Sequence, residues 1–178
     1  MRPSTSEFVR GRLDALPTVA LRPISEDDLD FLRALYADTR ADELAPLPWS
    51  TEQKRQFLGQ QFELQHRHYH SAHPQAEFLL ILEGALPIGR IYLERSTSSW
   101  SLIDIALVAE RRGHGLGSTL IAQLLHEACA AQSTVDLHVE VFNPARLLYE
   151  RCGFRFVENR GVYDFLIWSP EPAASTVS

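Results

Sequence analysis

The chain has 178 residues, of which 45% are hydrophobic, and a formal net charge of -6 at pH 7. This length predicts one domain with a sizeable core, and the negative charge argues against a protein held to nucleic acid by phosphate contacts. No apolar run approaches the roughly 20 residues of a membrane span, and residues 1–17 lack the apolar stretch of a secretory signal. Cys129 and Cys152 are the only cysteines. Two cysteines make no disulfide framework, so a cytoplasmic protein is expected. From the charge and the lack of a long apolar run, no nucleic-acid or membrane partner is expected.

Apolar periodicity and turn residues predict the secondary structure in chain order. A strand is expected at 18–22, a helix from Ser25 behind a capping-box sequence, and a second helix from Thr51 to about Tyr69. The expected elements that follow are two strands over 77–96 around a turn at 83–84, a strand over 101–110, a helix from about 117 to 131, a strand over 134–142, a short helix over 143–153 and a closing hairpin over 154–168.

This order predicts an α+β chain with a largely antiparallel sheet and one parallel crossover around the long helix. A single domain is expected at 17–169, between a loose N-terminal segment at 1–16 and a loose tail at 170–178.

The stretch RRGHGLG at 111–117 places three glycines between a strand and the long helix. A helix N-terminus has unpaired N–H groups and a partial positive charge, and glycines let an anion approach the bare backbone. Arg111, Arg112 and His114 add positive charge on an otherwise acidic chain. The stretch therefore predicts an anion-binding loop suited to phosphate or pyrophosphate.

Other uses of such a turn fit the sequence less well. A P-loop needs a lysine that is missing here. A dinucleotide fingerprint fits Gly113 and Gly115, and Glu140 could imitate its ribose-binding acid, but Ser118 stands at the third glycine position. Only one strand–helix–strand unit is expected. A glycine-rich turn chosen for its geometry alone remains an alternative.

The stretch LVAERRGHGLGSTLI resembles the acyl-CoA loop of the GNAT superfamily, the acetyl-CoA-dependent N-acetyltransferases. The family motif is Arg or Gln, two residues, Gly, one residue, then Gly or Ala, which here is Arg112, Gly115 and Gly117. A second stretch, NPARLLYERCGF at 143–154, resembles the family's Asn…Tyr…Gly-Phe segment. The resemblance implies a GNAT-like mixed, largely antiparallel sheet of six to seven strands, flanked by about four helices.

The resemblance also implies acetyl-CoA as co-substrate, without a metal, and a set of cofactor-binding residues. They are Ile105, Ala106 and Leu107 along the pantetheine arm, Arg112, Gly113, His114, Gly115, Leu116 and Gly117 around the pyrophosphate, Asn143 near the pantetheine, and Tyr149 beside the sulfur.

Acyl transfer to an amine needs a neutral nucleophile, support for the oxyanion and a proton for the departing thiolate. Tyr149 can protonate the thiolate, although packing in the core is an alternative role, and the Leu107 N–H can support the oxyanion. His138 and Glu140 share one face of their expected strand and are candidate bases. Asp104 on the preceding strand is a third candidate.

The acceptor site is expected near the first two helices, because these helices and their loop shape it in the GNAT superfamily. Glu43, Trp49 and Phe57 are the candidate substrate-binding residues. Histidines at 66, 68, 70 and 73 predict a solvated helix end, with a shared metal or a substrate-facing role as alternatives.

The expected function is transfer of an acetyl group from acetyl-CoA to a small-molecule or peptide amine, by direct attack in a ternary complex. The alternative is a non-catalytic acyl-CoA-binding or sensor module on the same fold. Exposed strand edges in such a fold could also pair two chains as a homodimer.

Overall fold

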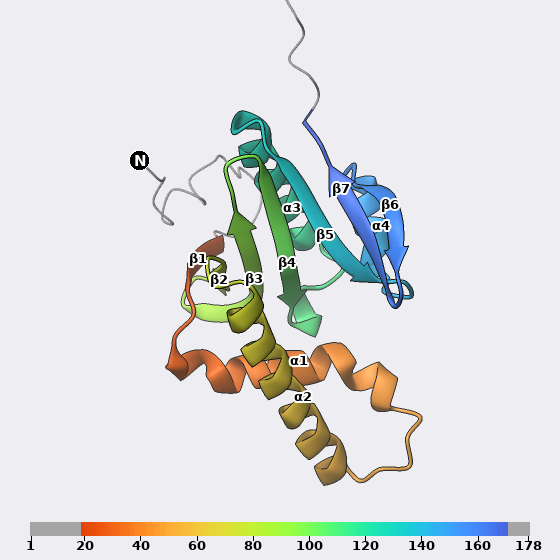
Figure 1. The fold of residues 1–178 in the computed structure, drawn as a ribbon. Coiled ribbons are helices and arrows are strands. Elements are labelled where there is room, and N and C mark those ends of the chain that lie inside the picture. The colour runs from red at the N-terminus through yellow and green to blue at the C-terminus, as the bar shows by residue number, and fades with distance from the viewer. Residues whose placement is uncertain (1–18, 171–178) are drawn as a thin grey trace, which may run out of the picture. The chain divides into compact units, whose positions relative to one another are not determined.

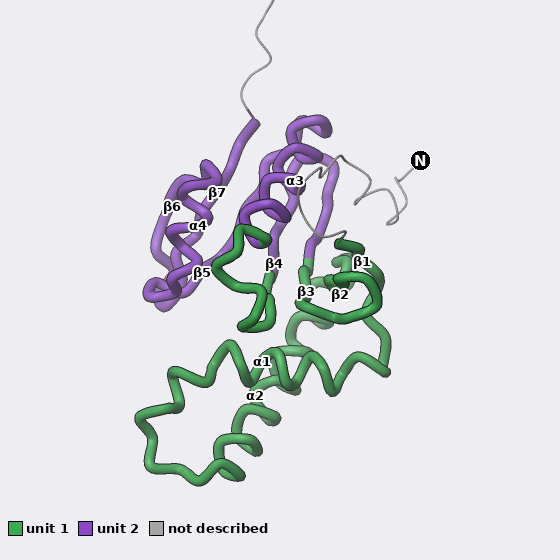
Figure 2. The backbone as a smooth tube through the Cα atoms, turned by 180° about the vertical axis from the view of Figure 1, so that it is seen from behind, with its two compact units in different colours: residues 1–92, 104–116 green, residues 93–103, 117–178 purple. Residues whose placement is uncertain are grey.

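A computed structural model describes residues 19–170 of the chain. The loose ends expected at 1–16 and 170–178 lie outside these residues, apart from Pro170. The chain divides into two compact units (Figure 2): unit 1 is Met1–Tyr92 with Asp104–Leu116, and unit 2 is Leu93–Ile103 with Gly117–Ser178. The single domain at 17–169 stays a prediction.

The order of helices and strands follows the sequence-based expectation (Figure 1). The elements are β1 (Val19–Pro23), the 3-10 helix η2 (Glu26–Asp28), α1 (Leu29–Leu44), α2 (Thr51–Ala72), β2 (Glu77–Glu83), β3 (Leu86–Arg95), β4 (Ser99–Leu107), the 3-10 helix η3 (Ala109–Arg111), α3 (Leu116–Ala130), β5 (Thr134–Glu140), α4 (Ala145–Arg151), β6 (Arg155–Arg160) and β7 (Tyr163–Trp168).

Hydrogen bonds order the seven strands as β1-β2-β3-β4-β5-β7-β6. The pair β4–β5 is parallel and is joined through α3, whereas β1–β2, β5–β7 and β6–β7 are antiparallel. This arrangement confirms the expected α+β class, with a largely antiparallel sheet and four α-helices. The strand expected to reach residue 110 ends at Leu107, because the backbone turns into η3 directly afterwards.

In unit 1, α1 and α2 pack together over a core that includes residues of both helices and of β2. The buried members are Leu32, Tyr36, Leu44, Leu58, Phe62 and Leu80. The helix starts follow the predicted capping boxes. Ser50 Oγ accepts from the Gln53 N–H at 3.2 Å, and Gln53 Oε1 accepts from the Ser50 N–H at 2.8 Å.

The buried carboxylate of Asp28 fixes the turn into α1. It accepts from the Ser25 N–H at 2.8 Å and from both Nη atoms of Arg22 at 2.7 Å. These bonds, the Arg22 bonds above all, hold the pKa of Asp28 well below its usual value.

In unit 2, β5 alternates strictly between buried and accessible residues. Val135, Leu137 and Val139 are buried, and the buried stripe of α3 includes Leu124 and Ala128. Both α3 and α4 lie behind the strands of this unit in Figure 1. The side chains of Thr134, Asp136, His138 and Glu140 therefore belong to the opposite face of β5.

The strand β6 is the last in the order, and all six of its residues are exposed. Its register with β7 shifts between Phe156 and Glu158, which is a β-bulge. Within residues 19–170, none of the helices has the length and apolar character needed to cross a bilayer.

Candidate functional site

The glycine loop of unit 1 leads from η3 into α3 at Leu116. Gly113 and Gly115 have φ angles of 73° and 83°, in the left-handed region that favours glycine. A Cβ built on either residue meets nothing within 4 Å, so open space lies over both. The loop therefore fits an anionic group bound by backbone N–H groups, and a side chain here would enter that space.

The two arginines before the loop are engaged by carboxylates of unit 1. Arg112 donates from Nη2 to Asp38 Oδ2 at 2.6 Å and from Nε to the Leu107 carbonyl at 2.8 Å. Arg111 donates from Nε to Glu83 Oε2 at 3.1 Å and also pairs with it through Nη2. The positive charge expected from these side chains is thus balanced by carboxylates, so an anion at this loop would meet mainly backbone N–H groups and the exposed His114.

A residue that the sequence analysis missed, Gly89 of β3, lies against the end of β4. A Cβ here would stand 2.4 Å from the Ala106 carbonyl oxygen and 2.8 Å from Leu107 Cδ2. Only glycine allows this approach, which brings β3 against two residues expected to line the pantetheine arm. An isolated glycine inside a strand pattern was the available signal.

The candidate base Asp104 is the counter-ion of a buried arginine. Its Oδ2 accepts from Nε of Arg90 at 2.6 Å, and Arg90 is 4% exposed whereas the Asp104 side chain is 22% exposed. Arg90 also donates to Gln65 Oε1 at 2.9 Å and lies over the Tyr92 ring. The main role of Asp104 in the structure is therefore to balance the charge of Arg90, which would be costly to bury alone.

The histidines of α2 form part of an aromatic stack in unit 1. The His66 ring lies 5.5 Å from Phe62 and 4.5 Å from His70, which stacks on Phe78 at 3.9 Å. Burial, together with His70, lowers the pKa of His66. Among the described residues, no three His, Cys, Asp or Glu side chains are placed to hold a metal ion. The helix ends at Ala72, close to these histidines, and His68 and His70 are exposed as a solvated helix end requires, whereas His66 is partly buried.

Two of the three candidate acceptor-binding residues come together in unit 1. The Trp49 and Phe57 rings meet edge to face at 5.2 Å, and they remain 38% and 36% exposed. The third, Glu43 of α1, pairs with Arg40 at 2.8 Å. The structure thus offers an accessible aromatic pair and an ion-paired carboxylate.

In unit 2, the Asn143 side chain bonds to the first residue of α4. Its Oδ1 accepts from the Ala145 N–H at 2.9 Å, but the helix begins at Ala145 with Pro144 at the N-cap position, slightly later than expected. Tyr149 is buried, and its ring meets Phe154 edge to face at 5.8 Å.

The candidate base His138 lies on the accessible face of β5. Its Nε2 accepts from Nη1 of Arg160 at 2.9 Å, and its ring lies 4.8 Å from Phe165. Desolvation, together with Arg160, lowers the pKa of His138, so the ring is neutral at pH 7. A proton can reach Nε2 only if Arg160 moves away. Glu140 lies opposite Tyr163 on the same face.

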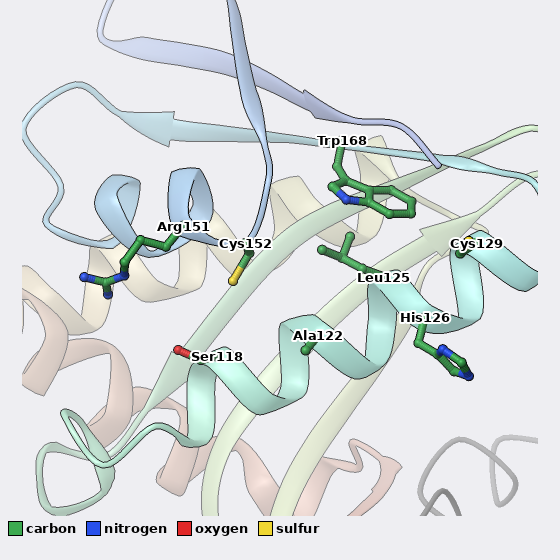
Figure 3. A pocket seen from close by; sticks show the side chains of 8 residues that line it. All are labelled: Ser118, Ala122, Leu125, His126, Cys129, Arg151, Cys152 and Trp168. Atoms are coloured by element: carbon green, nitrogen blue, oxygen red, sulfur yellow. The ribbon is translucent and has the colours of Figure 1, made fainter. Parts of the chain in front are cut away.

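A groove that the sequence did not predict lies in unit 2 (Figure 3). Its volume is about 530 Å³, and its lining comes from α3, the end of α4 and β7: Ser118, Ala122, Leu125, His126, Cys129, Arg151, Cys152 and Trp168. Both cysteines are free thiols, and burial raises the pKa of Cys152. These properties are those of partly buried cysteines that pack as small apolar residues, rather than those of a disulfide or an activated nucleophile.

Solved structures of acetyltransferases share this fold. The PaiA N-acetyltransferase from Thermoplasma acidophilum, in complex with coenzyme A, is 19% identical with a TM-score of 0.61, over 85% of this chain and 98% of that one. RimL, a ribosomal alpha-N-protein acetyltransferase in complex with coenzyme A, is 15% identical with a TM-score of 0.57, over 85% and 94%. A spermidine N-acetyltransferase chimera from Vibrio cholerae and hSSAT is 24% identical with a TM-score of 0.54, over 84% and 96%.

Comparison with curated proteins finds no match. The model of the acetyltransferase (GNAT) family matches residues 32–154. This range covers well over half of the chain and includes both the glycine loop and the Asn143–Phe154 segment. The chain therefore belongs to the GNAT acetyltransferase family.

Proposed function

We propose that the protein is an N-acetyltransferase that moves an acetyl group from acetyl-CoA to an amine by direct attack in a ternary complex. The observation that carries the proposal is the glycine loop, with open space over two left-handed glycines in a chain of the GNAT family. The structures of PaiA and RimL are complexes with coenzyme A, which supports the same co-substrate here.

The residues proposed to bind acetyl-CoA act mainly through their backbone. The N–H groups from Arg112 to Gly117 would hold the pyrophosphate at the start of α3. The parallel register of β4 with β5 ends at Leu102 opposite Leu137, but β4 continues to Leu107. The backbone of Ile105–Leu107 would therefore pair with the pantetheine arm. Asn143 contributes near the pantetheine. Acetyl-CoA itself, when bound, supplies the reactive thioester.

Side chains are proposed to carry out two proton transfers: removal of a proton from the acceptor ammonium and delivery of a proton to the departing thiolate. An alkylammonium with a pKa near 10.4 is only about 1 part in 2500 neutral at pH 7, a deficit of about 4.6 kcal/mol. His138, with its lowered pKa, is the proposed base, and Glu140 on the same strand face is the alternative. Tyr149 is proposed to protonate the departing thiolate, since a phenol (about 10) and a thiol (about 8.5) have similar pKa values.

The charges of α1 and α2 favour an acceptor with one amine and an apolar body over a polyamine. Five carboxylates of these helices are engaged by arginines of unit 1: Asp30 and Glu63 by Arg33, Asp38 by Arg112, Glu43 by Arg40, and Glu52 by Arg55. The accessible Trp49–Phe57 pair would contact the apolar body and could receive a cation on its rings. Glu43, once it leaves its ion pair with Arg40, is the proposed partner of the single ammonium before the ammonium loses its proton.

The alternative is a non-catalytic acyl-CoA-binding or sensor module, because the fold alone does not fix the activity. The deciding experiment measures thiol release from acetyl-CoA with a panel of arylalkylamines, polyamines, amino acids and peptide N-termini. Calorimetry with CoA runs alongside it. Acceptor-dependent thiol release supports the enzyme, and CoA binding without release across the panel supports the sensor. The cytoplasmic location and the homodimer remain predictions.

A further inference from the structure

We propose that Asp38 and Glu83 are positioning residues for the acetyl-CoA loop and act through Arg112 and Arg111. The inference rests on the proposed function, because it assumes that the loop binds the pyrophosphate of CoA. It assigns a role to two carboxylates that lie far from the loop in sequence and outside both family motifs.

The Arg112 guanidinium joins three segments of unit 1. Through Nη2 it reaches Asp38 of α1 at 2.6 Å, and through Nε it reaches the carbonyl of Leu107, the last residue of β4, at 2.8 Å. Arg112 itself stands directly before Gly113. One side chain therefore fixes where β4 ends and where the loop begins.

Arg111 holds the same turn through a second ion pair. Its guanidinium pairs with Glu83, the last residue of β2. The backbone of this segment is folded into η3, with the Arg111 N–H on the Val108 carbonyl at 3.0 Å and the Arg112 N–H on the Ala109 carbonyl at 3.1 Å. Consecutive arginines thus tie the turn to two different elements.

This arrangement bears on affinity because the anion is held by backbone N–H groups rather than by charged side chains. A loop already held in its binding conformation loses less conformational freedom when the ligand arrives. The Asp38–Arg112 pair leaves both side chains 42% exposed, so it contributes little to the stability of the whole fold. Its effect is expected on CoA affinity instead.

A competing role for Arg112 predicts that the CoA affinity changes in the opposite direction when the Asp38 charge is removed. If Arg112 bound phosphate directly, Asp38 would compete for its guanidinium, and removing the Asp38 charge would tighten CoA binding. If Asp38 positions the loop, removing that charge weakens CoA binding. The sign of the change separates the two roles without any structure of a complex.

The test is calorimetry with CoA on wild type, Asp38→Asn, Glu83→Gln, Arg112→Gln and the double variant Asp38→Asn/Arg112→Gln. Each single variant is expected to raise the Kd for CoA about threefold to tenfold. Glutamine at 112 keeps a donor for the Leu107 carbonyl and occurs in the family motif, but it carries no charge and forms no ion pair with a carboxylate. The double variant should bind within about twofold of Arg112→Gln, because both changes break one interaction.

Asp30→Asn is the matched control, since Asp30 lies on the same helix and pairs with Arg33 while 99% exposed. It should leave the Kd for CoA unchanged. The KM for acetyl-CoA should rise in Asp38→Asn and Glu83→Gln, whereas kcat at saturation and the melting temperature should stay close to wild type. A purely structural role would instead lower the melting temperature together with the affinity.

Unchanged or tighter CoA binding in Asp38→Asn and Glu83→Gln overturns the inference, as does an additive double variant. If wild type itself does not bind CoA, the proposed function fails. If wild type binds and the variants match it, only the positioning role fails.

Discussion

Replacing Gly89 by alanine tests how tightly β3 must approach the end of β4. The new Cβ would stand 2.4 Å from the Ala106 carbonyl oxygen, whereas a close carbon–oxygen contact measures about 3.3 Å. The strands must therefore separate locally by about 0.9 Å. The Leu107 side chain, at 2.8 Å, can rotate away, but the Ala106 carbonyl belongs to the backbone and must take the strand with it.

The strain should lower the free energy of unfolding by about 2 kcal/mol, within the usual range for overpacking. For a chain of this size, this is a fall in melting temperature of about 4–8 °C. Because Ala106 and Leu107 are proposed to pair with the pantetheine arm, a shift of about 1 Å should also lower kcat/KM for acetyl-CoA by about 10²-fold.

Gly59→Ala provides the control, because the same methyl group is added in α2, where a Cβ meets nothing within 4 Å. This variant should gain about 0.5–1 kcal/mol of stability from improved helix propensity and keep its activity. Thermal unfolding and acetyl-CoA kinetics of both variants complete the assay. A Gly89→Ala protein with the melting temperature and kcat/KM of wild type would refute the close-approach argument.

The remaining predictions concern proton transfer, the loop and acid stability. Tyr149→Phe should lower kcat by about 10²–10³ with little change in CoA affinity; a kcat within twofold of wild type, where chemistry limits the rate, would leave Tyr149 a packing residue. Gly115→Val should abolish CoA binding in calorimetry while the protein stays folded, because φ is 83° and the side chain would enter the anion's space; wild-type affinity would contradict the anion-binding loop. Asp28→Asn should lower the free energy of unfolding by about 2 kcal/mol at pH 7. Since Arg22 depresses the pKa of Asp28, this stabilisation is complete above about pH 4 and is lost as the pH falls further. Urea unfolding in which Asp28→Asn is less stable than wild type by the same amount at pH 7 and in strong acid would contradict this role of the Asp28 charge.

Local sequence patterns were sufficient for the elements and for the loop. The capping residues Ser25 and Ser50 mark real helix starts, and Gly113 and Gly115 lie in the loop that their spacing indicated. Each of these features depends on neighbours within a few residues, which is why the sequence shows them.

The partners of the loop could not be read from the sequence. Asp38 lies 74 positions from Arg112, and nothing in the local pattern of α1 distinguishes it from the other acidic residues there. The sequence analysis therefore counted Arg111 and Arg112 as free positive charge. Gly89 was missed for a related reason, since its role depends on a backbone atom of another strand.

The exposed edge strand β6 bears on how the protein behaves at high concentration. An unpaired strand edge is a template for adding further strands from other molecules, and Phe156 and Val157 are half exposed on this one. The bulge between Phe156 and Glu158 interrupts its regular hydrogen-bond pattern, and Arg155 and Arg160 place charge at both ends. These features disfavour the addition of further strands to the edge. Replacing Arg155 and Arg160 with neutral residues should therefore make the protein precipitate at lower concentration.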